Sequence, residues 1–467
     1  MFIEKFGNVA LRVIAIISLA RLLGPEEFGL FALAAVVVSI CSILVDSGLG
    51  GALIKKSNIS KEDYETVFVF NVLVSVLLTF LLILISDSFG KFYDSNELST
   101  LLKALSVVLI VKALSIVQMT KLTKELKFKP QAKIVLLSYL ISLIVACVLA
   151  FYGYGYWALV WQQIIEASLT AIMFIIYANY FPKFKFNTKS FKDLYSFGLK
   201  LMLASFIKTI YQQTATLIIG KRFDPGTVGL FNQANKIIEL YVNAISAIID
   251  KASFPILVKQ LEKNGDLTED LKRLLITSCF LSFFAISVIG GMSDSIVIVL
   301  LGDKWLEAAW MLEILSLCGV FIVVESVTRS GLKSLGKAGK ILQLEIIKRS
   351  FSIFILILAA NFGLAYILWA LVINSAIGAF LNVIAISKYT GYKISTQLAN
   401  IAVPLSSGFC VYLILKYLKG IVEVNIFAEL FTLVALTALL YIGMGYLSKS
   451  KEIIELLSSI KFISKFK

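Results

Sequence analysis

A row of polar side chains recurs at steps of three or four residues between residues 232 and 250. The row consists of Asn232, Asn235, Lys236, Glu239, Asn243, Ser246 and Asp250. This spacing places all of them on one stripe of a helix, while apolar residues such as Ile237 and Ile245 fall largely elsewhere. Amide, ammonium and carboxylate groups in this arrangement can bind a polar ligand, or they can pack against polar groups of neighbouring helices. The stripe therefore predicts either the wall of a water-filled cavity or a polar helix contact.

Further cations and amides stand in apolar segments without an acidic residue nearby. Lys208 and Gln212 lie one helical turn apart near the middle of segment 194–219, and Lys200 lies nearer its end, where it could extend to the membrane surface. A lysine at the centre of a membrane helix costs roughly 2.5 to 3.5 kcal/mol, so a mid-span cation should face a cavity or a partner on another helix. The candidate cavity residues are therefore Arg12, Lys112, Lys200, Lys208, Gln212, Asn232, Lys236, Glu239 and Asn243.

Acidic residues at membrane depth are fewer than the cations. Glu325 and Arg329 have i,i+4 spacing, and Glu345 lies beside Lys348 and Arg349, so local neutralisation and a ligand role are both open for these groups. The candidates for ion coupling or charge balance are Glu166, Glu239, Glu325 and Arg329. The excess of cations favours an anionic substrate.

Composition defines the elements that must position these side chains. The chain has 467 residues, of which 59% are hydrophobic and 16% charged, and its mean hydropathy is +0.89. This composition predicts an all-α integral membrane protein, because the apolar runs are continuous rather than alternating. We expect fourteen membrane-spanning helices at residues 6–23, 28–50, 66–86, 98–120, 131–152, 156–179, 194–219, 228–254, 271–292, 308–331, 341–361, 364–387, 396–418 and 426–447.

Part of the sequence occurs twice, about 200 residues apart. Residues 24–34 return as residues 224–234, with identities in register at Pro25/Pro225, Gly29/Gly229, Leu30/Leu230, Phe31/Phe231 and Ala34/Ala234. Weaker echoes follow in the same order, and such duplication in a membrane protein is typical of a transporter with its site between the halves. We expect an N-terminal lobe of six spans over residues 1–192 and a C-terminal lobe of six spans over residues 193–390. Residues 391–467 should add two further spans and a basic tail.

The distribution of positive charge predicts the orientation. With the N-terminus placed in the cytoplasm, the inner segments hold 26 lysines and arginines and the outer segments hold six, which predicts that both termini are cytoplasmic. The net charge of +14 is then explained by contacts with anionic membrane lipids rather than with nucleic acid. The first apolar segment lacks a cleavage site and is expected to remain in the membrane.

Several kinds of chemistry have no support in the sequence. The chain contains no histidine, and all five cysteines fall inside apolar segments without metal-ligand spacing. No P-loop, nucleophile elbow or zinc-protease motif is present. We therefore expect no catalytic residues, no metal and no cofactor, and transport driven by a Na+ or H+ gradient rather than by ATP.

Several motifs resemble one known family in chain order. The run from Ala20 to Gly29 (ARLLGPEEFG), the segments 46–50 and 156–160, and the run from Gly302 to Trp305 are similar to the polysaccharide transport (Wzx-type) branch of the multidrug/oligosaccharidyl-lipid/polysaccharide exporter superfamily. The resemblance covers essentially the whole chain. A proline common in that branch at the position of Tyr241 is missing here.

This resemblance implies two six-helix lobes with two additional C-terminal helices, as in multidrug exporters. It also implies that undecaprenyl-diphosphate-linked oligosaccharide is moved from the inner to the outer leaflet of a bacterial or archaeal cell membrane by alternating access, with polysaccharide assembly proteins as further partners. Three alternatives remain open. A multidrug-type antiporter should show acids dominating its cavity, a glycan polymerase or ligase should have a large outer loop, and a scaffold protein should have a dry groove.

Overall fold

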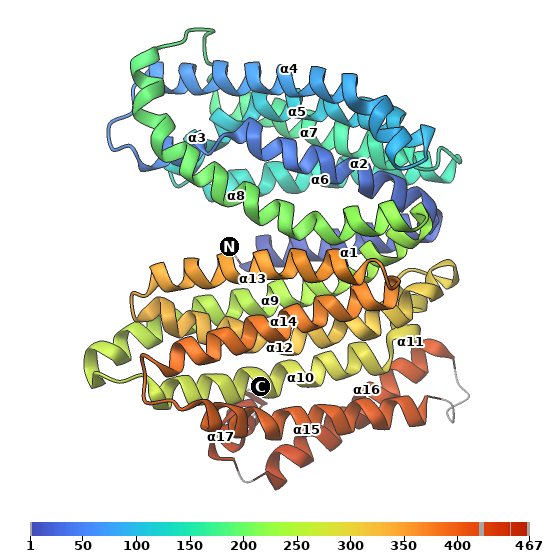
Figure 1. Ribbon diagram of the computed structural model, residues 1–467, viewed down its shortest axis with the longest axis vertical. Helices are drawn as coiled ribbons and strands as arrows, with labels where there is room; N and C mark the ends of the chain where they lie inside the picture. The colour runs from blue at the N-terminus through green and yellow to red at the C-terminus, as the bar shows by residue number, and fades with distance from the viewer. Residues whose placement is uncertain (1, 420–424, 449, 465–467) are drawn as a thin grey trace. The chain divides into compact units, whose positions relative to one another are not determined.

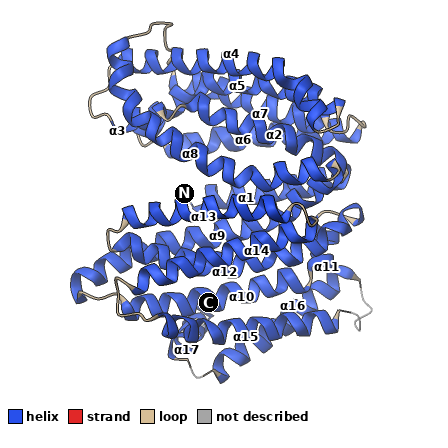
Figure 2. Cartoon of the chain, viewed as in Figure 1, coloured by secondary structure: helices blue, strands red, loops and turns tan. Residues whose placement is uncertain are grey.

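The computed structural model describes residues 2–419, 425–448 and 450–464, and every regular element in these ranges is a helix (Figure 2). Fourteen of the described helices are at least 21 residues long. This number is compatible with the fourteen predicted spans. Ten long helical stretches are also apolar enough to cross a membrane by length and composition, so the chain is a multi-pass membrane protein.

The four remaining long helices are too polar for that test. They are α1 (Phe2–Leu22), α8 (Thr188–Arg222), α9 (Pro225–Asn264) and α13 (Ala338–Ala359). At 1.5 Å per residue, α8 and α9 are about 50 and 60 Å long, well beyond the roughly 30 Å of a hydrocarbon core. All four carry mid-helix residues that stood out in the sequence, such as Arg12, Lys208 and the polar stripe. Polar and charged side chains, and not insufficient length, exclude these four helices.

The chain divides into two compact units, residues 1–232 and residues 233–467. The division falls inside α9, whereas the repeat predicts a lobe boundary at residue 192; the repeat-based boundaries remain a prediction. The first unit contains α1, α8 and the first two turns of α9, together with α2 (Pro25–Asp46), α3 (Leu49–Lys55), α4 (Lys61–Phe92), α5 (Asn96–Lys124), α6 (Phe128–Phe151) and α7 (Trp157–Ala178).

The second predicted span is broken near its end. Ser47 and Gly48 both have positive φ, 52° and 64°, and separate α2 from the short helix α3. A Cβ on Gly48 would lie 2.2 Å from the carbonyl oxygen of Gly198 in α8. Glycine therefore allows both the left-handed turn and the close approach of α8.

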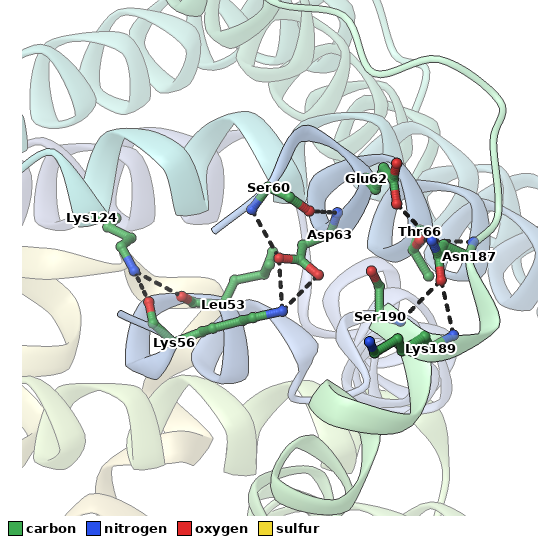
Figure 3. Close-up of polar contacts among 10 residues, drawn as sticks. All are labelled: Leu53, Lys56, Ser60, Glu62, Asp63, Thr66, Lys124, Asn187, Lys189 and Ser190. Atoms are coloured by element: carbon green, nitrogen blue, oxygen red, sulfur yellow. Dashed lines mark hydrogen bonds and ion pairs between the residues drawn. The ribbon is translucent and has the colours of Figure 1, made fainter. Parts of the chain in front are cut away.

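Helix α8 is attached to α4 at both of its ends. At its first turn, the Asn187 side chain accepts hydrogen bonds from the backbone N–H groups of Lys189 and Ser190, at 2.9 and 3.2 Å (Figure 3). The backbone N–H of Asn187 donates to Thr66 at 3.1 Å, and its side-chain amide donates to Glu62 at 2.6 Å. At the far end of α8, the Tyr93 hydroxyl donates to the Leu217 carbonyl at 3.3 Å. These contacts fix the helix that carries Lys200, Lys208 and Gln212.

The buried carboxylate of Asp63 links the first turns of α4 and α8, because Ser190 of α8 hydrogen-bonds to it. Asp63 is 1% exposed and caps its own helix through reciprocal hydrogen bonds with Ser60. The Lys56 ammonium lies 2.9 Å from the Asp63 carboxylate. Lys124 of α5 donates to the carbonyls of Leu53 and Lys56 (Figure 3). This network joins α3, α4 and α5 at the same end of the first unit where α8 begins.

The two copies of the repeated motif pack against each other within the first unit. A Cβ added at Gly29 would lie 1.7 Å from the Pro225 carbonyl oxygen, and one added at Gly229 would lie 1.9 Å from the Pro25 carbonyl oxygen. The starts of α2 and α9 therefore cross backbone to backbone, and each copy contributes the same residues to the crossing. Only glycine permits this approach.

The second unit is built around α10 (Thr268–Gly291) and α12 (Ala309–Ser334), with α13, α14 (Leu364–Ser387), α15 (Ile394–Leu418) and α16 (Ile426–Leu447). Short elements at α11 (Ser293–Leu300) and at a 3-10 helix (Asp303–Ala308) precede α12. One apolar core joins α9, α10, α12 and α14. A second core joins α10 to α15, α16 and the short C-terminal helix α17 (Lys451–Ser464), which lie together in Figure 1. Helix α9 runs unbroken past Tyr241, as expected without the proline.

Candidate functional site

A cluster of charged and aromatic residues lies halfway along four helices of the first unit. Arg12 is in the middle of α1, Lys112 of α5, Tyr139 of α6 and Glu166 of α7. Helix α7 packs against α5 and α6, and α6 packs against α1. The packing of these helices brings together three charged groups that are far apart in the sequence.

The contacts within this cluster are electrostatic. The Arg12 guanidinium lies over the Tyr139 ring, 5.5 Å from its centroid, which is cation–π geometry. The Glu166 carboxylate interacts electrostatically with both Arg12 and Lys112. Gln162, one turn before Glu166 on α7, interacts with the Tyr139 hydroxyl. A direct ion pair to Glu166, within 4.0 Å, does not occur in the described part of the chain.

The cluster has a net positive charge and is accessible. Arg12 and Lys112 are exposed, whereas Glu166 is half-buried. Two cations and one acid leave one positive charge, and Arg12 retains its guanidinium N–H donors because the contact with Tyr139 uses the face of the ring. Such an arrangement can bind an anion with several oxygen atoms, such as a phosphate or diphosphate.

The predicted residues of α8 lie on an accessible part of that helix. Lys200, Lys208 and Gln212 are all exposed. Further along α8, the Thr216 hydroxyl donates to the Asn232 side chain at 3.3 Å, and Asn232 itself donates to the Val228 carbonyl at 2.9 Å. Asn232 is therefore engaged in packing α8 against the start of α9, whereas the other three residues are free of the apolar core.

The middle of the polar stripe of α9 lies opposite the face that packs into the second unit. Tyr241, Ile245 and Ile249 contact the apolar core of that unit, while Lys236, Glu239 and Asn243 are exposed. Asn235 donates to Glu239 at 2.8 Å. Toward the other end of the stripe, Ser246 is hydrogen-bonded to Ser326 of α12 at 3.0 Å. The side chain of Asp250 lies outside the described residues.

A second charged network, within the second unit, is fully paired. The Lys348 ammonium of α13 lies 2.7 Å from Glu325 of α12 and 3.0 Å from Glu345, and Arg349 lies 3.1 Å from Glu345. The described ion pairs of Glu325 are therefore with Lys348 and not with Arg329, which is half-buried nearby in α12. Two acids and two cations cancel. This network holds α12 and α13 together, and its four members have no net charge.

Sequence reasoning missed two members of the first-unit cluster. Tyr139 lies in the middle of its segment, whereas aromatic residues that anchor a helix at the membrane surface lie near segment ends. That position was the available signal. Gln162 gave none, because a single amide in an apolar helix is usually satisfied by packing. The described residues contain no group of three histidine, cysteine, aspartate or glutamate side chains that could hold a metal ion.

The chain is similar to proteins of polysaccharide biosynthesis. Residues 18–310 match the family described as polysaccharide biosynthesis protein, and the chain belongs to this family. It is 25% identical over 298 residues to the teichuronic acid biosynthesis protein TuaB of Bacillus subtilis (strain 168), covering 63% of this chain and 62% of that protein. It is 22% identical over 314 residues to the lipopolysaccharide biosynthesis protein WzxC of Escherichia coli (strain K12), covering 67% and 64%. The matches thus span less than two thirds of each relative.

Two solved structures share the fold. The lipid II flippase MurJ in an inward closed conformation aligns with a TM-score of 0.74 at 15% identity, over 96% of this chain and 98% of that chain. An inward-facing multidrug resistance transporter of the MATE family, from the MOP superfamily, aligns with a TM-score of 0.58 at 16% identity, over 85% and 96%. The chain therefore shares its fold with these two proteins, as the resemblance in the sequence implied.

Proposed function

We propose that this protein is a flippase for lipid-linked oligosaccharide. Its substrate is an undecaprenyl-diphosphate-linked repeat unit of a surface polysaccharide, which it moves from the inner to the outer leaflet by alternating access. The proposal is supported by membership of a polysaccharide biosynthesis family and by the fold that the chain shares with the lipid II flippase MurJ.

One observation carries the proposal. Arg12 and Lys112 lie at mid-helix depth in the first unit and are exposed, with a single half-buried acid near them. A cation at this depth is costly unless it has an anionic partner or a water-filled cavity. A diphosphate carries several negative oxygens that guanidinium and ammonium groups bind well. The excess charge disfavours the antiporter alternative, in which acids would meet a cationic drug.

The proposal also covers the membrane location of the protein, the ion gradient that drives transport and the partners. We place the protein in a bacterial or archaeal cell membrane with both termini in the cytoplasm, because the predicted inner loops hold most of the lysines. A Na+ or H+ gradient drives the cycle, and Glu166, Glu239 and Glu325 are the acids at which a coupling cation could act. Anionic lipids contact the basic inner loops, and polysaccharide assembly proteins are partners.

The test uses a cell whose surface polysaccharide depends on this protein. Arg12→Gln and Lys112→Gln, alone and combined, should reduce surface polysaccharide at least tenfold in the double variant, since each removes about 1.4 kcal/mol or more of diphosphate binding. Lipid-linked oligosaccharide should accumulate in the inner leaflet. Lys129→Gln, an exposed lysine in the first turn of α6, is the matched control and should export normally. Normal export by the double variant, at equal protein level, would contradict the proposal.

A further inference from the structure

Glu166, the acid of the first-unit cluster, lies near two cations without forming a direct ion pair with either. Glu166 faces two cations on different helices, yet neither is directly paired with it among the described ion pairs. In the second unit, by contrast, Glu325 and Glu345 hold Lys348 at 2.7 and 3.0 Å. The first unit therefore keeps its cations under the influence of a carboxylate without occupying their hydrogen-bond donors.

We propose that Glu166 is a built-in counter-anion that competes with the substrate's diphosphate for Arg12 and Lys112. This inference rests on the proposed function and adds a property of its binding site. In the empty protein, the carboxylate offsets one of the two positive charges, which would otherwise both be uncompensated at this depth. When a diphosphate binds the cations, the same carboxylate repels it. Glu166 thus weakens substrate binding and allows release into the second leaflet.

The surrounding residues suit this role. The Arg12 guanidinium rests on the Tyr139 ring at 5.5 Å and is not drawn into an ion pair. Gln162, on the same face of α7 as Glu166, interacts with the Tyr139 hydroxyl. Tyr139 and Gln162 are therefore positioning residues that hold the cation near the acid without direct contact. Because Arg12 rests on the Tyr139 ring and is not ion-paired with Glu166, its guanidinium N–H groups remain available to the substrate.

The experiment measures binding of farnesyl diphosphate to the full chain in lipid nanodiscs. Glu166→Gln removes the charge and keeps the size of the side chain. This variant should bind the probe at least about tenfold more tightly, because the negative diphosphate no longer meets a negative carboxylate in a medium of low effective dielectric constant. Glu166→Asp keeps the charge and should bind close to wild type. Glu97→Gln, an exposed acid at the start of α5, removes the same charge from a distant point and should change Kd less than about twofold.

Combining Glu166→Gln with the substitutions of Arg12 and Lys112 separates this inference from the proposed function. In an Arg12→Gln/Lys112→Gln background, the probe should bind too weakly to give a Kd, and Glu166→Gln should not restore binding, because the cations for which it competes are gone. In the export assay, Glu166→Gln should lower both the KM and the maximal rate, a combination that a merely structural defect would not give. An unchanged or larger Kd in Glu166→Gln, with binding still lost in the double cation variant, overturns the inference alone. Wild-type binding by the double cation variant overturns the proposed site and the inference together.

Discussion

Ionised residues at membrane depth in this protein fall into two kinds. Lys348 is 11% exposed and touches two carboxylates, whereas Arg12 and Lys112 are exposed and share one acid at longer range. The paired charges join α12 to α13, and we propose that the cations with unpaired donors bind a ligand. The same residue type thus has different surroundings in the two units, which composition alone does not distinguish.

The paired network should be required for folding. Lys348→Met leaves the half-buried Glu325 without its cation, which should cost up to about 3 kcal/mol and lower the yield and melting temperature of purified protein. Glu325→Gln combined with Lys348→Met restores neutrality, because Arg349 still pairs with Glu345, and should recover most of the loss. The control is Lys416→Met, whose side chain is 46% exposed in its pair with Glu313, so the pair should be worth less than about 1 kcal/mol. Equal losses in the two lysine variants would contradict this assignment.

The exposed lysines of α8 and α9 should matter for export and not for folding. Lys208 and Lys236 are both exposed on long, polar helices. Lys208→Ala combined with Lys236→Ala should abolish polysaccharide export while the protein remains at its normal level in the membrane. Immunoblotting of membranes beside a surface polysaccharide assay provides the measurement. Unaltered export would remove both residues from the mechanism.

At the scale of elements, the two copies of the repeat begin their helices by complementary means. Before α2, the Glu27 side chain accepts a hydrogen bond from the Gly24 backbone N–H at 2.9 Å. Before α9, the Asp224 side chain accepts from the Thr227 backbone N–H at 2.9 Å and from its hydroxyl at 2.6 Å. Positions 24 and 27 in the first copy, and 224 and 227 in the second, thus form a cap. The acid is the later of the two residues in the first copy, Glu27, and the earlier in the second, Asp224.

Loss of the Asp224 cap should destabilise the protein in a pH-dependent way. Burial raises the pKa of Asp224, but the hydrogen bonds from Thr227 lower it more, so its pKa in the folded protein lies below the ordinary value of 3.8. The stabilisation is therefore complete above pH 3.8 and is lost as the pH falls through the folded-state pKa. Asp224→Ala should cost about 1 kcal/mol at neutral pH, measured by thermal unfolding in detergent. Asp224→Asn should keep most of the stability and lose its pH dependence; an equal loss in both would argue against a cap.

The glycine crossing should tolerate no side chain. Gly29→Ala or Gly229→Ala places a Cβ within 2 Å of a backbone carbonyl oxygen, so α2 and α9 must separate. We expect either variant to lose most export and several degrees of melting temperature. Gly443→Ala, in α16 with no atom within 4 Å of the added Cβ, is the control and should be neutral or slightly stabilising. Wild-type behaviour of both crossing variants would show that the crossing is not maintained in the membrane.

Hydropathy and the repeat predicted most of the elements, but not their breaks or contacts. Long apolar runs define helices because the bilayer requires internal hydrogen bonding of the backbone. The break at Ser47 and Gly48 lies inside one such run; the Ser-Gly pair is a local turn signal, but the close approach of α8 at Gly48 could not be read from the sequence. Helix α17 is too short and polar to register as a span. The clustering of Arg12, Lys112 and Glu166 depends on helix packing, which a single sequence does not specify.

At the scale of the whole molecule, polarity is concentrated in a few helices. Of the fourteen long described helices, α1, α8, α9 and α13 fail the test of an apolar span, and three of them carry candidate cavity residues. A carrier needs such helices, because its substrate's charged group must cross the bilayer in contact with protein and water.

Transbilayer movement of a labelled substrate tests the central claim most directly. A short-chain prenyl-diphosphate-linked disaccharide bearing a fluorophore is placed in both leaflets of proteoliposomes, and a membrane-impermeant quencher reports how fast the inner pool reaches the outer face. The account predicts that the wild-type protein accelerates this movement and that the Arg12→Gln/Lys112→Gln variant does not, although Lys129→Gln does. A wild-type rate equal to that of protein-free liposomes, or equal rates for wild type and the double variant, would contradict it.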